Sequence, residues 1–253
     1  MSDVNILKSL RKYERRKNMR NPINALRRGI HFLPCYLEIK RMPKNISLEK
    51  LVDKTFNSWG EILSPLQVKS EIIGLLKILK KKKPKVILEI GTAKGGTLFL
   101  FSRVAHEDSI IISLDLPKGE FGGGYSIFKI PLYKSFSREN QKIHLVRADS
   151  HKEETLKKIK SILRGKKVDF LFIDGDHTYK GVKTDFKVYS PLVRESGIIV
   201  FHDVAKVSSG QKGNVRKFWK EVKSDYKKEI IEDEKQGWGG IGIIKKNKKF
   251  DKK

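Results

Sequence analysis

The sequence predicts an α/β fold with one doubly wound, mainly parallel sheet. Three observations lead to this prediction: short apolar runs rich in β-branched residues recur along the chain, stretches with helical spacing separate them, and a glycine turn follows the first run. Strands and helices that alternate in this way form parallel sheets with right-handed crossovers. Ligands bind at the carboxyl ends of such strands, so candidate site residues are expected there.

The first predicted strand, 86–90, leads directly into the glycine turn. Its apolar residues suit a strand that is covered on both faces. The glycines of the turn are Gly91, Gly95 and Gly96. Glycines let the backbone turn sharply and approach a ligand closely, and helical spacing resumes at Thr97. Because Ala93 stands where a dinucleotide fingerprint has its middle glycine, the turn alone fits a simple strand-to-helix connection equally well.

The second predicted strand, 110–115, ends in Asp115, which lies 24 residues after Gly91. A carboxylate at this place can hold the two hydroxyl groups of a ribose. The alternative is an aspartate that only caps the next turn. Glu89 lies at the end of the first strand, where a carboxylate is costly unless a ligand or the facing loop donates hydrogen bonds to it. Both acids are therefore candidate ligand-binding residues.

The rest of the chain continues the alternation of strands and helices. Further strands are predicted at 143–148, 168–173 and 198–201, with short ones at 230–231 and 241–244. A helix is predicted from Leu66 to Lys81, with Ser64 as its N-cap and Pro65 in its first turn. The glycine-rich stretch 117–126 is either a flap that closes over a substrate or a surface connection.

The chain is strongly basic, with 55 Lys and Arg residues against 29 Asp and Glu residues and a net charge of +26. This balance favours polyanions such as nucleic acid, phosphorylated substrates or an anionic membrane surface. Much of the charge lies in solvated lysine runs, which also fit a lysine-biased proteome. We expect a basic, helical N-terminal extension over 1–60, an α/β domain over 61–246 and a lysine-rich tail over 247–253.

Cys35 is the only cysteine of the chain, so a disulfide framework is excluded. A reducing compartment, the cytoplasm, is expected. The N-terminus is basic, but the apolar run near Ile30 is short and stops at Glu38. We therefore predict neither a signal peptide nor a membrane span. The sequence leaves open whether the chain forms a homo-oligomer.

Polar side chains follow two neighbouring strands. Asp174, Asp176 and His177 come after the strand at 168–173, and His202 and Asp203 come after the strand at 198–201. Adjacent parallel strands lie about 4.8 Å apart, so their ends can share one ion. Two carboxylates and an imidazole suit Mg²⁺ or Mn²⁺, and iron or zinc is an alternative. The competing interpretation is a set of strand-end acids that bind loop amides and helix N-termini.

Together these segments resemble the class I S-adenosylmethionine-dependent methyltransferases. Within that class they are similar to the branch with macrolide-sugar O-methyltransferases and cephalosporin-hydroxylase-like proteins. The resemblance spans about residues 60 to 245. Its motifs are the glycine turn at 89–96, Asp115, the flap at 121–125, and the stretches 148–151, 172–179 and 201–203.

The resemblance implies a Rossmann-like, seven-stranded sheet whose last strand is antiparallel, with S-adenosylmethionine at the glycine turn. The cofactor-binding positions that it implies are Glu89, Gly91, Thr92, Gly95, Asp115, Asp149 and Ser150. The metal positions of related enzymes fall on Asp174, His202 and Asp203. In those enzymes the pair that matches His202 and Asp203 usually consists of two acids or of Asp and Asn, so His202 departs from the pattern. His177 matches the catalytic base of the sugar-methylating relatives. The expected reaction is metal-assisted O-methylation of a hydroxyl group on a small molecule or sugar.

Three other function classes compete with this reading. A nicotinamide-dependent oxidoreductase would share the turn and the acid at the end of the second strand, but it should have a fuller glycine fingerprint. A nucleic-acid methyltransferase, acting for example on RNA, fits the charge, but outside the basic N-terminal stretch the sequence has no basic stripe with interleaved aromatic residues. A non-catalytic protein that binds S-adenosylmethionine is the third.

Overall fold

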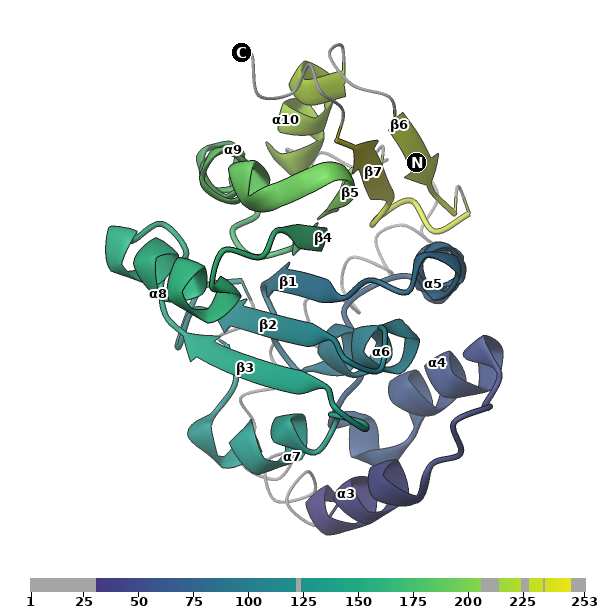
Figure 1. Ribbon diagram of the computed structural model, residues 1–253. Helices are drawn as coiled ribbons and strands as arrows, with labels where there is room; N and C mark the ends of the chain where they lie inside the picture. Colours follow the sequence, from purple (N-terminus) through teal and green to yellow (C-terminus); the bar gives the residue numbers. More distant parts are fainter. Residues whose placement is uncertain (1–30, 122–123, 206–213, 224–227, 234, 247–253) are drawn as a thin grey trace.

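The computed structural model describes residues 31–121, 124–205, 214–223, 228–233 and 235–246. The stretch 1–30 of the predicted extension and the predicted tail at 247–253 therefore lie outside the described residues. A seven-stranded sheet with the order β3-β2-β1-β4-β5-β7-β6 forms the centre of the molecule (Figure 1). The strands are β1 Val86–Ile90, β2 Ile110–Asp115, β3 Lys142–Arg147, β4 Val168–Ile173, β5 Val193–His202, β6 Lys228–Ile231 and β7 Ile241–Lys245.

The first five strands pair in parallel, whereas β7 pairs antiparallel with both β5 and β6. The mainly parallel sheet predicted from the sequence is thus confirmed, including its antiparallel last strand. The strand β1 lies inside the sheet between β2 and β4, and all five of its residues are buried. Burial on both faces explains why all of its residues except Glu89 are apolar.

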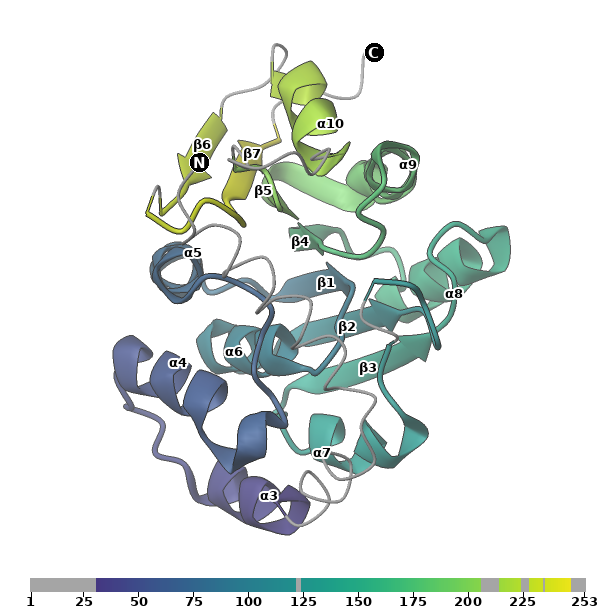
Figure 2. The same ribbon diagram turned by 180° about the vertical axis from the view of Figure 1, so that it is seen from behind.

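Helices cover both faces of the sheet (Figures 1 and 2). The helices are α3 Phe32–Arg41, α4 Leu48–Asn57, α5 Lys69–Lys82, α6 Gly96–Val104, α7 Ile130–Lys134, α8 Glu153–Leu163, α9 Tyr179–Tyr189 and α10 Asn214–Lys223. Successive residues of β1 point to opposite faces: Ile87 packs in the cluster with α3 to α7, and Leu88 packs in the cluster with α8 to α10. This two-layered covering is the doubly wound arrangement.

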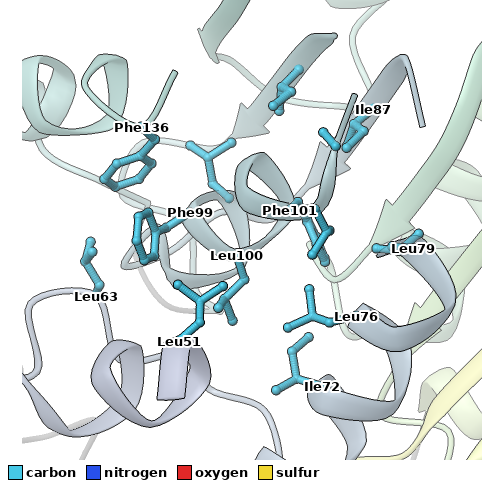
Figure 3. Close-up of a cluster of buried hydrophobic side chains, with 14 of the residues drawn as sticks. Leu51, Leu63, Ile72, Leu76, Leu79, Ile87, Phe99, Leu100, Phe101 and Phe136 are labelled. Atoms are coloured by element: carbon cyan, nitrogen blue, oxygen red, sulfur yellow. The ribbon is translucent and has the colours of Figure 1, made fainter. Parts of the chain in front are cut away.

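The core on the side of α6 is built largely from aromatic and leucine side chains (Figure 3). Phe101 lies edge-on to Phe170 and Phe172 of β4, with ring centroids 5.0 and 5.2 Å apart. Leu51 of α4 and Cys35 of α3 belong to the same buried cluster. Residues 31–60 therefore pack directly on the helices that cover the sheet.

The helix predicted to begin at Leu66 begins instead at Lys69, and its N-cap Val68 makes no side-chain capping bond. The predicted Ser64 cap was wrong because the preceding segment folds back on the glycine turn. A Cβ atom at Gly96 would collide with the carbonyl oxygen of Leu63, so the two backbones touch. The segment 62–67 is thus part of the wall around the strand ends.

Candidate active site

The strand order gathers the predicted site residues along one edge of the sheet. Glu89 and Asp115 lie at the ends of β1 and β2, and Asp149 and Asp174 follow the ends of β3 and β4. His202 is the last residue of β5. Because β3, β2, β1, β4 and β5 are consecutive neighbours in parallel, their carboxyl ends form one continuous edge. The predicted cofactor positions and the predicted metal positions occupy its two halves.

The glycine turn needs its glycines for close backbone approach. Gly91 has a φ of 90°, and a Cβ atom there would collide with the carbonyl oxygen of Asp174. Gly95 has a φ of 86°, and a Cβ atom there would collide with the ring of Tyr133. Left-handed backbone of this kind favours glycine. The turn is therefore held between the end of β4 on one side and α7 on the other.

Glu89 is a fully buried carboxyl group at the start of the turn. Its Oε2 accepts a hydrogen bond of 2.8 Å from the hydroxyl group of Thr92, whereas its Oε1 has no hydrogen-bond partner in the described part of the chain. Burial raises the pKa of Glu89 to about 8, against the opposite effect of the hydroxyl groups of Thr97 and Thr92. A buried acceptor of this kind favours a ligand that donates hydrogen bonds.

Asp115 closes the turn from the neighbouring strand. Its Oδ2 accepts a hydrogen bond of 3.0 Å from the backbone N–H of Ala93. Burial raises the pKa of Asp115 to about 6, although hydrogen bonds from the N–H groups of the turn lower it. Asp115 therefore holds the turn in place.

Asp149 and Ser150 lie just beyond β3. The Oδ1 atom of Asp149 accepts a hydrogen bond of 2.8 Å from the backbone N–H of His151, so Asp149 shapes the loop that leads to α8. The carbonyl group of Ser150 accepts a hydrogen bond of 2.7 Å from the hydroxyl group of Tyr189. The loop is thereby anchored to α9 at the β3 end of the edge.

The ends of β4 and β5 bring together two histidines and two aspartates. His177 Nδ1 lies 2.6 Å from Asp203 Oδ2, and His177 Nε2 lies 3.7 Å from Asp174 Oδ1. His202 Nδ1 lies 3.1 Å from Asp174 Oδ1 and 3.4 Å from Asp203 Oδ1. Burial lowers the pKa of His177, but the hydrogen bond to Asp203 and the charges of Asp174 and Asp203 outweigh it, so the pKa lies above its ordinary value.

The side chains of the three predicted metal ligands contact one another in this arrangement. Asp174 and Asp203 both approach the same nitrogen of His202, which lies between them. Among the residues that the structure describes, no group of three or more His, Cys, Asp or Glu side chains is placed to hold a metal ion. The donor atoms are of the right chemistry for a divalent cation, but here they contact one another, so we derive no step through a metal.

Sequence reasoning missed two residues of this edge and undervalued a third. Gln67 donates from Nε2 to Asp174 Oδ2 at 2.6 Å, and Tyr133 donates to the carbonyl oxygen of Ala93 at 3.3 Å. Neither has a local sequence signal, because each reaches the site from a distant segment. Phe121 of the predicted flap lies over His177, with ring centroids 5.0 Å apart. Gly122 and Gly123 of that flap lie outside the described residues.

The residues of the edge fit S-adenosylmethionine. Glu89 Oε1 and Gln67 Oε1 are buried acceptors without hydrogen-bond partners among the described residues, and Asp115 adds a carboxylate between them and Asp149. Such a set of acceptors suits a ligand that is cationic and rich in hydroxyl groups. Carboxyl groups beside the turn suit the pyrophosphate of a dinucleotide less well. The chemistry of the edge therefore favours the sulfonium cofactor over a nicotinamide dinucleotide.

Comparison with solved structures agrees with this fold. The chain superposes on an O-methyltransferase of Bacillus cereus in complex with S-adenosylhomocysteine with a TM-score of 0.55 and 17% identity, covering 81% of this chain and 93% of that one. A putative O-methyltransferase of Klebsiella pneumoniae gives 0.54 and 18% identity, over 84% of this chain and 94% of that one. The O-methyltransferase TomG of Streptomyces achromogenes, solved with S-adenosylmethionine, gives 0.53 and 16% identity, over 81% and 92%.

Sequence comparisons find two uncharacterised relatives and one family model. An uncharacterised protein of Acanthamoeba polyphaga mimivirus is 30% identical over 123 residues, which are 49% of this chain and 53% of that protein. An uncharacterised protein of Sinorhizobium fredii is 25% identical over 143 residues, which are 55% of this chain and only 15% of that protein. Residues 88–204 match the family model described as "Methyltransferase domain". Over these residues, just under half of the chain, the sequence is thus similar to a methyltransferase domain, and the sheet has the fold of the class I S-adenosylmethionine-dependent methyltransferases.

Proposed function

We propose that this protein transfers a methyl group from S-adenosylmethionine to a hydroxyl group of a small molecule. The observation that carries the proposal is the pair formed by His177 and Asp203, 2.6 Å apart, at the edge of the sheet that also holds the glycine turn. Residues 61–246 contain all of these groups, and we assign the activity to them. The cofactor positions of the proposal are Glu89, Gly91, Thr92, Gly95, Asp115, Asp149 and Ser150.

The hydrogen bond to Asp203 determines what His177 can do. Because Asp203 accepts a hydrogen bond at Nδ1, the Nδ1 atom carries the proton and the Nε2 atom of the neutral imidazole is left as an acceptor. His177 then removes the proton of the acceptor hydroxyl group, which makes its oxygen a nucleophile. S-adenosylmethionine supplies the methyl group that this oxygen receives. Asp203 stabilises the imidazolium ion that forms, as the aspartate of a His–Asp pair does.

The acceptor class follows from the resemblance rather than from a bound ligand. The similarity to sugar-methylating enzymes favours a sugar hydroxyl group. Phe121 lies over the ring of His177, so an apolar surface adjoins the proposed base. A ring-shaped acceptor with one hydroxyl group toward His177 and an apolar face toward Phe121 is consistent with this arrangement.

Binding of a divalent cation, Mg²⁺ above all, by Asp174, His202 and Asp203 stays a prediction. A chelator tests it directly: if activity falls in EDTA and returns with Mg²⁺, a metal takes part. Unchanged turnover in EDTA would show that His177 and Asp203 act without one.

The proposed function is tested with S-adenosylmethionine that carries a labelled methyl group, incubated with a small-molecule cell extract. We expect label in an O-methylated product, which mass spectrometry identifies. His177→Ala should abolish transfer and leave the affinity for S-adenosylhomocysteine nearly intact, and Asp203→Asn should lower kcat by about 10²-fold, because general base catalysis contributes on this order. Full turnover of His177→Ala would refute the role of the histidine.

A further inference from the structure

Gln67 is a buried amide group that neither the motifs nor the family match includes. It lies before α5, outside the matched residues 88–204, and the residue is only 6% exposed. Its Nε2 donates to Asp174 Oδ2 at 2.6 Å. Its Oε1 is buried and has no hydrogen-bond partner within the described ranges. Buried acceptors are almost always satisfied in folded proteins, so this oxygen calls for a donor from elsewhere.

The groups around Gln67 determine what kind of donor fits. The carboxylate of Asp174 accepts the hydrogen bond from the Gln67 amide, and the backbone of Asp174 lies against Gly91. Glu89, at the end of the adjacent β1, adds a second carboxyl group with an unsatisfied oxygen. All of these groups accept hydrogen bonds or carry negative charge. A ligand group that is positively charged and has several N–H bonds is therefore favoured here.

The strand order indicates which end of the cofactor reaches this point. Asp149 and Asp115 lie at the ends of β3 and β2, on one side of the glycine turn, and Gln67 and Asp174 lie at the end of β4, on the other side. Because Asp115 is the predicted contact of the ribose, the nucleoside of the proposed cofactor lies on the side of Asp115 and Asp149. The amino-acid end of the cofactor then extends toward β4. Its α-ammonium group carries three N–H donors, whereas its sulfonium group carries none.

On the basis of the proposed function, we propose that Gln67 binds the α-ammonium group of S-adenosylmethionine through Oε1 while its Nε2 holds the carboxylate of Asp174. One amide group thus connects the amino-acid end of the cofactor to the acid that lies 3.7 Å from His177 Nε2. The residue is a cofactor-binding residue contributed by the segment before the matched domain. It also makes the placement of Asp174 depend on the same side chain that receives the cofactor.

The test compares two ligands in a calorimeter. S-adenosylhomocysteine has the α-ammonium group, and 5′-methylthioadenosine has the same nucleoside and a sulfur atom but lacks the amino-acid part. Methionine is close to glutamine in length and has no amide, so Gln67→Met removes the acceptor with little change of volume. We expect S-adenosylhomocysteine to bind at least about tenfold more weakly to this variant, because a hydrogen bond to a charged group is lost. Binding of 5′-methylthioadenosine should stay within about twofold of the wild type.

Gln141 offers a matched control. It is also 6% exposed, and its Nε2 donates to the carbonyl oxygens of Ser102 and His106, away from the edge with the proposed site. Gln141→Met removes a buried glutamine amide without touching Asp174. In Gln141→Met we expect the ratio of the affinities for S-adenosylhomocysteine and 5′-methylthioadenosine to equal that of the wild type. Gln67→Asn, whose oxygen is one methylene shorter in reach, gives a second variant if Gln67→Met does not fold.

Two results would overturn the proposal. The first is an unchanged affinity for S-adenosylhomocysteine in both Gln67 variants. This result would overturn the proposal even if the variants raised the KM for the methyl acceptor. The second is an equal loss of affinity for both ligands, which would make Gln67 a structural residue. Failure of the wild-type protein to bind either ligand would instead contradict the proposed function itself.

Discussion

Glu89 is the residue whose chemistry the fold changes most. In the unfolded chain its carboxyl group has an ordinary pKa of about 4.3. In the folded protein, burial at the end of β1 raises the pKa to about 8. Between these two values the folded chain binds more protons than the unfolded chain, so Glu89 makes the protein less stable as the pH rises through that range.

We expect the free energy of unfolding of the wild type to fall between about pH 5 and pH 8 more steeply than that of Glu89→Gln. The difference in slope should approach about 1.4 kcal/mol per pH unit where only one state is protonated. Urea denaturation at a series of pH values measures it, in the absence of cofactor. Glu195→Gln, at an exposed carboxyl group of β5, is the control and should keep the wild-type slope. Parallel curves for wild type and Glu89→Gln would contradict the prediction.

The placement of the candidate site residues at strand ends could be predicted from the sequence, but their partners could not. Asp174, His202 and Asp203 come directly after predicted strands, and parallel pairing alone brings them together. The pairing of His177 with Asp203 depends on the loop after β4 and on the left-handed backbone of Asp203, whose φ is 63°. Gln67 lies 107 residues before Asp174 in the sequence and carries no motif. Contacts of this kind follow only from the packing of whole elements.

At the level of elements, the glycine turn is fixed by its neighbours rather than by a ligand alone. Gly91 and Gly165 both have positive φ values, 90° and 80°. A Cβ atom at Gly91 would collide with the backbone of Asp174, whereas nothing lies within 4 Å of a Cβ atom at Gly165. The two positions therefore separate backbone strain from steric collision.

We expect Gly165→Ala to lower the free energy of unfolding by about 1–2 kcal/mol, the cost of left-handed backbone for an alanine. Gly91→Ala should cost clearly more, because the ends of β1 and β4 must move apart, and it should also lose binding of S-adenosylhomocysteine. Denaturation and calorimetry on both variants test this. Equal destabilisation of the two would mean that the close approach of Gly91 to Asp174 has no energetic role.

The sequence predicted the strands better than the helix starts. Runs such as 168–173 are apolar apart from Asp169 because β4 is buried between β1 and β5, and burial of this kind leaves a clear pattern. The start of α5 was predicted three residues too early. Ser64 and Pro65 have the composition of a helix start, but the segment they belong to packs on Gly96 and delivers Gln67 to Asp174. Tertiary packing therefore overrode the local signal.

At the scale of the whole molecule, the net charge of +26 is the feature that the proposed site does not use. Residues 1–30 hold nine Lys and Arg residues and two acids. Among the described residues, Lys80, Lys81 and Lys82 lie in the last turn of α5, where a helix dipole favours cations. No helix in the described ranges is both long and apolar enough to span a membrane.

This charge predicts binding to RNA without methylation of RNA. Counterion release makes such binding strongly dependent on salt, so we expect the affinity for a single-stranded RNA to fall at least about tenfold between 50 and 200 mM salt. Fluorescence anisotropy measures the affinity, and deletion of residues 1–30 should reduce it because seven net positive charges are removed. In the same buffers, total RNA should take up no label from the methyl donor, whereas the small-molecule extract should. Labelled RNA that persists in 200 mM salt would favour the nucleic-acid methyltransferase instead.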